Sequence, residues 1–420
     1  MDKKKTIGMC WDTTANNTGV HEGAARHFEV CMEHAILWCP CRRHMIELHI
    51  KHAYEALFGG TQGKDNTLFK RFKEWYLQKL HEDDQFPDPA GFKKWRWPRP
   101  TSQKNRQLIA WATETREKTT EWLTEGTFPR EDYREKVELT HFILGGDPIR
   151  RRGDGVVDYF KMRRPGPIHH ARFMARSITC MKMYILSDIF PLSQEEKSNL
   201  NRIVLLLITL YNVHFLSCPL ATSAPRNDLN FIYKLRIYRT VDAVVADAAL
   251  ASCYRHLMYV VPEMVVLALF DDDVPNQEQA AMSNALRACP RPNVLPPGKP
   301  GQPSFTPQIR KLTDAKPCLS EFITEKSWLL FHLIDADTQW LSEPVETWHQ
   351  IPAYLDQRDF CRHIEVVNDC AERAIKDCQQ FAKKSASPEH RDCMITVAGD
   401  HRGRASTITR KDGLNNMARR

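Results

Sequence analysis

Two short apolar runs alternate with two helix-like segments at the start of the chain, and this order limits the folds that are open to it. Thr6–Trp11 (TIGMCW) and Ala35–Cys39 (AILWC) have the length and apolar content of buried strands. Val20–Glu33 and Arg42–Leu57 have the apolar spacing of helices, and Gly59 and Gly60 end the second one. A strand–helix–strand–helix order predicts two parallel strands.

Helical periodicity dominates the chain from about Phe69 to Asp273. After a proline-rich linker we expect two more helices, a short strand at Ile364–Val367 and a helix at Asn368–Phe381. The helices that we expect before the linker are Leu68–Leu80, Gln103–Leu123, Arg130–Leu144, Pro167–Ile189, Gln194–Leu216, Asn227–Arg239, Val241–Leu257 and Pro262–Phe270.

The fold class that follows is mixed α/β and mostly α, with a partial α/β core interrupted by a large all-α insertion. The expected parts are the first part of the core (1–60), the helical insertion (61–289), the proline-rich linker (290–318), the return to the core (319–382) and a basic, disordered tail (383–420).

Composition narrows the cellular setting. Lys and Arg number 59 against 52 acidic residues, and a net charge of +7 permits nucleic-acid binding without establishing it. The 13 cysteines and a start (MDKKKTIGMC) without an apolar signal region predict reduced thiols in the nucleus or cytoplasm, not a secreted protein. The apolar run Ile203–Leu210 is far shorter than the roughly 20 residues of a membrane span, so we expect a buried core helix and no membrane.

Asp12 follows the first predicted strand and precedes a polar segment, TTANNTG. An aspartate at the carboxyl end of a buried strand is well placed to bind a metal ion. It is also well placed to cap the following turn, and the local sequence favours the cap.

Cys39, Cys41 and His44 (WCPCRRH) have the spacing of half a zinc site. No second C-x-x-C follows, and His49 and His52 lie on the predicted helix, so zinc binding is not expected. The other interpretation is a buried cysteine and a histidine that join the strand to its helix.

Asp369 and Glu372 (VVNDCAERAIKDC) stand at the start of a helical pattern, as in a capping box. The functional interpretation places the Glu372 carboxylate in a metal site. A basic segment lies between the Asp12 and Glu372 motifs in the sequence. It is interpreted either as a solvated loop or as a phosphate-binding segment. Its candidate phosphate contacts are Arg150, Arg151, Arg152, Arg163, Arg164 and Arg172.

The order of these motifs resembles the catalytic core of hAT-like and P-element-like transposases, which is RNase H-like. The resembling segments are WDTTANNTG, CRRH, RRPGPIHHARFMA, APRNDL and VVNDCAER, within Ile7–Phe381, and they also resemble transposon-derived proteins of invertebrate genomes. The resemblance implies that Asp12 and Glu372 are catalytic carboxylates that bind Mg²⁺ or Mn²⁺. It implies that Cys41 and His44 are the C-x-x-H motif beside Asp12.

The resemblance also implies a first catalytic aspartate on a strand before Asp12, where only Met1–Trp11 stand in this sequence. We therefore expect a degenerate or domesticated transposase core that binds DNA weakly and without sequence preference but does not cleave it. A homo-oligomer is compatible with the sequence. The alternative is a non-catalytic helical interaction or scaffold protein derived from a transposon.

Overall fold

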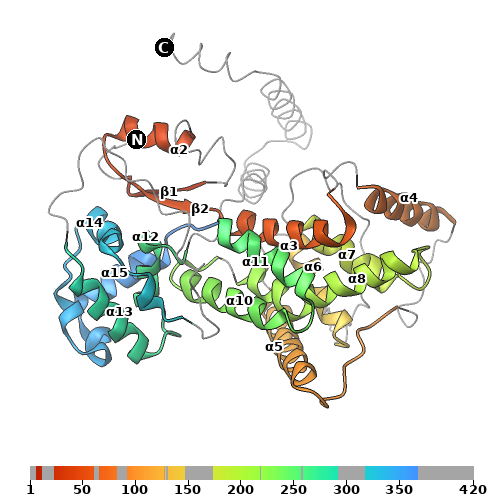
Figure 1. Cartoon of the computed structure of the whole chain (residues 1–420). Coiled ribbons are helices and arrows are strands. Elements are labelled where there is room, and N and C mark those ends of the chain that lie inside the picture. The colour runs from red at the N-terminus through yellow and green to blue at the C-terminus, as the bar shows by residue number, and fades with distance from the viewer. Residues whose placement is uncertain are drawn as a thin grey trace, which may run out of the picture. The chain divides into compact units, whose positions relative to one another are not determined.

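The two predicted strands form a parallel pair. The computed structural model describes residues 6–11, 23–60, 66–82, 92–126, 128, 131–146, 174–217, 219–256, 259–291 and 317–367. Strand β1 (Gly8–Trp11) pairs with β2 (Leu37–Pro40), with Gly8 opposite Leu37 and Trp11 opposite Pro40 (Figure 1). Helix α2 (Ala24–Met32) connects them. The predicted order of elements at the start of the chain is confirmed.

Side chains of β2 alternate between two apolar clusters, as the two-residue period of a strand requires. Leu37 and Cys39 belong to the main core of the protein. Ile36, which precedes the strand, and Trp38 form a second cluster with Ala25 of α2. The small sheet is therefore covered on both faces, which explains why its strands are apolar without interruption.

Helices make up most of the described chain, and several begin with the side-chain caps that stabilise helix N-termini. Ser102 accepts a hydrogen bond from the Asn105 amide, and Ser193 forms a capping box with Glu196. The helices after α2 and before the linker are α3 (Arg42–Phe58), α4 (Thr67–Glu82), α5 (Gln103–Glu125), α6 (Glu131–Ile143), α7 (Ala175–Ile185), α8 (Gln194–Leu206), α9 (Asn212–Leu216), α10 (Ala224–Tyr238), α11 (Ala243–His256), α12 (Pro262–Val265) and α13 (Asn276–Ala288).

Helix α3 is the main connection between the sheet and the helical part. It starts directly after β2 and packs along α11, with Ile50 and Ala53 fully buried. The ring of His49 forms a 3.0 Å hydrogen bond with the hydroxyl of Ser252 in α11. The position of the sheet is therefore tied to that of the helices around α3.

The segment predicted as one helix from Gln194 to Leu216 contains a π-helical turn, η4 (Leu207–Tyr211), between α8 and α9. By length and composition this is the one helical span among the described residues that could cross a membrane. However, 72% of its most apolar window is buried inside the protein. The prediction of a buried core helix at Ile203–Leu210 is confirmed.

Two sequence predictions about secondary structure were wrong. Helix α13 was not predicted, because the polar start of its sequence (NQEQ) hides an apolar stripe that contains Met282 and Leu286. Residues 364–367 do not form the expected strand. They form no ladder with the small sheet, and the segment is attached instead by a single backbone hydrogen bond, from Arg42 N to Val366 O.

Between the linker and residue 367 the described chain consists mainly of short helical turns. The two expected helices are α14 (Leu329–Leu333) and α15 (Pro352–Arg362), and 3₁₀ turns surround them. The turns pack around a cluster of aromatic rings, in which Trp340 lies 4.8 Å from Trp348 and 5.0 Å from Tyr354 between ring centroids. The 3₁₀ turns are η5 (Val266–Phe270), which continues α12, η7 (Leu319–Phe322), η8 (Glu325–Trp328), η9 (Gln339–Ser342) and η10 (Val345–Gln350).

Candidate functional site

The carboxyl ends of both strands meet the start of α3. The amide of Cys41, the N-cap residue of α3, donates a 2.6 Å hydrogen bond to the carbonyl of Trp11, the last residue of β1. The hydroxyl of Tyr259 donates a 2.9 Å hydrogen bond to the carbonyl of Pro40, the last residue of β2. Both strand ends are therefore fixed. The residue after Trp11 is Asp12, which lies outside the described residues.

The segment that leads to Glu372 returns to the same place. The amide of Arg42, the first residue of α3, donates a 2.9 Å hydrogen bond to the carbonyl of Val366. The Val366 side chain is 1% exposed and belongs to the main core. Three distant parts of the sequence therefore meet at one edge of the sheet, through Trp11, Cys41, Arg42 and Val366.

Three thiols gather beneath this edge. A hydrogen bond with Cys41, together with burial, raises the pKa of the Cys10 thiol above its ordinary range, and the nearby carboxylate of Glu365 raises it further. Burial raises the pKa of the Cys39 thiol to about 12. The thiols of Cys10 and Cys39 are therefore protonated at neutral pH. The cluster packs against the edge of the sheet.

Among the described residues, no group of three or more His, Cys, Asp or Glu side chains is arranged to hold a metal ion. The predicted metal ligands Asp12 and Glu372 lie outside this part of the chain.

A buried ion pair holds the first turn of α3. The guanidinium of Arg42 binds the carboxylate of Asp228 in α10, and both side chains are 1% exposed. The ring of His214 stacks on Phe231 with 4.0 Å between centroids, and its Nε2 lies 3.7 Å from the Asp228 carboxylate. Burial and the charge of Arg42 lower the pKa of His214 well below its usual value, so this histidine is neutral at physiological pH. Arg42 is therefore the cation that balances Asp228.

A second carboxylate, largely buried, lies further along α3. Glu47 accepts a 3.1 Å hydrogen bond from the hydroxyl of Tyr211, which the π-helical turn η4 carries. Arg176 lies 3.7 Å from the same carboxylate. Burial nevertheless raises the pKa of Glu47 to about 7, while Arg176 and Lys136 oppose the shift. The protonation state of this group therefore changes near neutral pH.

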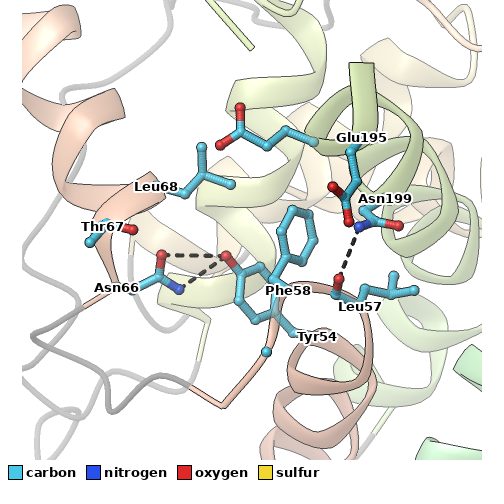
Figure 2. A pocket seen from close by; sticks show the side chains of 10 residues that line it. Tyr54, Leu57, Phe58, Asn66, Thr67, Leu68, Glu195 and Asn199 are labelled. Atoms are coloured by element: carbon cyan, nitrogen blue, oxygen red, sulfur yellow. Dashed lines mark hydrogen bonds between the residues drawn. The ribbon is translucent and has the colours of Figure 1, made fainter. Parts of the chain in front are cut away.

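A pocket lies at the opposite end of α3. It measures about 410 Å³, and Tyr54 and Phe58 line it with stacked rings whose centroids are 4.4 Å apart (Figure 2). Asn66 bonds the Tyr54 hydroxyl, and Asn199 donates to the carbonyl of Leu57. At 1.5 Å per residue, α3 separates this pocket from the sheet edge by roughly 24 Å. None of the predicted site residues lines it.

Two predicted site residues are described. Cys41 is fully buried, and its amide joins α3 to β1. His44 is half-buried in the first turn of α3, and its bracing role stays a prediction. The residues whose predicted roles lie outside the described part of the chain are Asp12, Glu372, Arg150, Arg151, Arg152, Arg163, Arg164 and Arg172.

Sequence patterns missed Tyr259 and Glu365, which also shape this edge. A lone tyrosine in a loop has no local signature, because its partner is distant in the sequence. Asp228 belongs to the segment APRNDL of the sequence analysis, but nothing in that segment indicates its partner Arg42.

Comparison of the sequence with protein-family models finds no match, and comparisons with curated proteins and with solved structures find none either.

Proposed function

We propose that this chain carries part of a transposase catalytic core of the RNase H-like type, with Asp12 and Glu372 as carboxylate ligands of Mg²⁺ or Mn²⁺. Divalent ions in such a site activate a nucleophile and stabilise the leaving oxygen during DNA strand cleavage and transfer. Carboxylate oxygens are hard ligands that suit these ions, whereas thiolates are soft ligands that suit other metals.

One observation carries the proposal: Trp11, Cys41, Arg42 and Val366 meet through backbone hydrogen bonds at one edge of the sheet. Trp11 is the residue before Asp12, and Val366 is six positions before Glu372 (372 − 366). Six residues span at most about 20 Å, so the chain length allows Glu372 to lie near the Asp12 strand end, as the proposal requires. Asp12 and Glu372 are 360 positions apart in the sequence (372 − 12), and the hydrogen bond between Arg42 and Val366 is what links their two segments.

DNA contacts come from the basic segment that precedes α7. Arg150–Arg152, Arg163, Arg164 and Arg172 are cations of the type that position a nucleic-acid backbone without reading its sequence. We therefore expect weak duplex binding without sequence preference. A site with two divalent ions needs more negative charge than the two assigned carboxylates supply. We therefore expect no DNA cleavage by this chain alone.

The test is a gel-shift and nicking assay on generic duplex DNA, in Mg²⁺ and in Mn²⁺. Arg163→Ala/Arg164→Ala should weaken binding and lower the slope of log K against log salt by about 1.8, since each phosphate contact contributes about 0.9. Arg116→Ala/Lys118→Ala, which removes two exposed cations of α5, is the matched control and should leave binding unchanged.

Two results would change the proposal. Metal-dependent nicking that Glu372→Gln abolishes would contradict the loss of activity and establish the catalytic role. Absence of binding at low salt, or equal binding by both double variants, would remove the DNA role. The helical interaction or scaffold protein would then be the better account, because its α3–α11 packing needs neither metal nor DNA.

A further inference from the structure

A short segment rich in lysine, arginine and tryptophan runs across the ends of two helices. Residues Phe92–Pro100 (FKKWRWPRP), called here the basic-aromatic strap, form neither helix nor strand. The amide of Lys93 donates to the carbonyl of Ile185, the last residue of α7, at 3.0 Å. The amide of Trp95 donates to the carbonyl of Ile143, the last residue of α6, at 2.8 Å. The strap is thus fixed at two points by its own backbone.

Burial alternates along residues 93–96 of the strap, and the Lys94 ammonium also lies 5.0 Å from the centroid of the Phe142 ring in α6. Lys93 and Trp95 are half-buried against the helices, whereas Lys94 and Arg96 are exposed. Arg99 is also exposed. Among the described residues, Lys94, Arg96 and Arg99 form no ion pair with a carboxylate, although many exposed cations of this protein do, such as Arg71 with Glu196.

The tryptophans are held in place before any ligand arrives. The indole N–H of Trp97 donates a 3.2 Å hydrogen bond to the carbonyl of Leu144, and 36% of this side chain is exposed. Its ring lies 5.1 Å from that of Trp95 between centroids, at an angle of 54°. A fixed, exposed indole beside exposed cations offers a stacking surface at little cost in conformational entropy.

Capping of the helix ends explains only part of the strap. Cations near helix C-termini are favourable, and the backbone amides satisfy carbonyls that the helices leave open. This accounts for Lys93, whose ammonium also contacts Ser187 and Asn201. It does not account for the partly exposed ring of Trp97, or for Arg96 and Arg99, which form no ion pair with a carboxylate of the described residues.

We propose that the basic-aromatic strap binds single-stranded nucleic acid. Lys94, Arg96 and Arg99 contact successive phosphates, and one base stacks on Trp97. The proposal uses none of Asp12, Glu372 or the arginines of the basic segment. It needs no metal ion, so it stands or falls independently of the proposed function.

The test measures fluorescence anisotropy of a labelled oligothymidylate with the full chain, in buffer that contains EDTA. Lys94→Ala/Arg96→Ala should weaken binding at least tenfold and lower the salt slope by about 1.4, since a single strand contributes about 0.7 per phosphate. Arg116→Ala/Lys118→Ala is the control of equal charge and should bind like the wild type.

Stacking is tested with two variants that lose the same indole hydrogen bond. Trp97→Leu should bind about tenfold more weakly, whereas Trp97→Phe, which keeps an aromatic face, should stay within a few-fold of the wild type. On an abasic strand of the same length, Trp97→Leu should bind like the wild type because there is no base to stack.

Three results would overturn the proposal. The first is an equal loss of binding in the strap variant and the α5 control. The second is equal binding by Trp97→Leu and Trp97→Phe to oligothymidylate. The third is binding to phosphatidylserine vesicles that excess oligothymidylate does not displace, which would make the strap a contact for anionic lipid surfaces.

Discussion

Arg42 and Asp228 form an ion pair that is almost completely buried, although 186 positions separate them in the sequence. Arg42 is also the residue whose amide binds Val366. The same residue therefore fixes the start of α3 against α10 through its side chain and attaches the returning segment through its backbone. The edge that we assign to the metal site depends on this residue.

Removal of one partner of the pair should be costly. Arg42→Met or Asp228→Leu alone leaves the other group buried with reduced compensation, and we expect a loss of about 3–5 kcal/mol in the free energy of unfolding. The double variant should be less destabilised than either single variant. Arg239→Met, which removes one partner of an exposed pair with Asp247, is the control and should cost less than about 1 kcal/mol. Urea denaturation measures all four, and additive effects of the two core substitutions would refute the coupling.

Glu47 should make stability depend on pH. Burial raises the pKa of Glu47 from 4.5 to about 7, so the folded protein binds this proton more tightly than the unfolded chain does. The contribution of Glu47 to the free energy of unfolding is fully present below pH 4.5, the pKa in the unfolded chain. It is lost as the pH rises from there through 7, by about 3 kcal/mol in total. Glu47→Gln should remove that part of the pH dependence while its amide oxygen still accepts from Tyr211.

The measurement is the difference in unfolding free energy between wild type and Glu47→Gln at pH 5 and at pH 8. The variant should be relatively more stable at the higher pH. Glu55→Gln on the same helix, which pairs with Lys51 at 3.9 Å near the surface, serves as the control. A constant difference across this range would show that Glu47 stays ionised when the protein is folded.

Replacement of Gly8 should weaken the pairing of β1 with β2. A Cβ atom at this position would lie 2.8 Å from the carbonyl oxygen of Leu37, which is backbone and cannot move without disturbing the sheet. We expect Gly8→Ala to lower the free energy of unfolding by about 1–3 kcal/mol. Gly60→Ala, where nothing lies within 4 Å, should have little effect in the same thermal denaturation experiment. Equal midpoints for the two variants would show that β1 tolerates displacement.

The sequence predicted the opening of the fold because its signals are local. The apolar runs around Met9 and Trp38 and the helical spacing after Arg42 are visible within a dozen residues, and the parallel pairing follows from their order. Helix α13 was missed because its polar first turn conceals the apolar stripe. The basic-aromatic strap was also missed, although its alternation of Trp with Lys and Arg is a signal for nucleic-acid binding.

The candidate site could be predicted only in its local part. The contact of Cys41 with the end of β1 follows from the C-x-x-H spacing after a strand. The bond between Arg42 and Val366 joins residues 324 positions apart (366 − 42), and no local pattern encodes it. The same is true of Tyr259 beneath Pro40. Only the folded chain shows that these segments meet.

The central claim is that Asp12 and Glu372 bind one divalent ion together. It is tested by replacing Mg²⁺ with Fe²⁺ and adding ascorbate and peroxide, so that radicals formed at the ion cut the nearby backbone. Mass spectrometry then maps the cuts. We predict cuts in the backbone around both Asp12 and Glu372, and excess Mg²⁺ should suppress them. Asp12→Asn and Glu372→Gln should each abolish the cuts at both places. The control Glu343→Gln, which changes an exposed carboxylate elsewhere, should leave them unchanged. Cuts confined to one of the two segments, or cuts that persist in both variants, would contradict the claim.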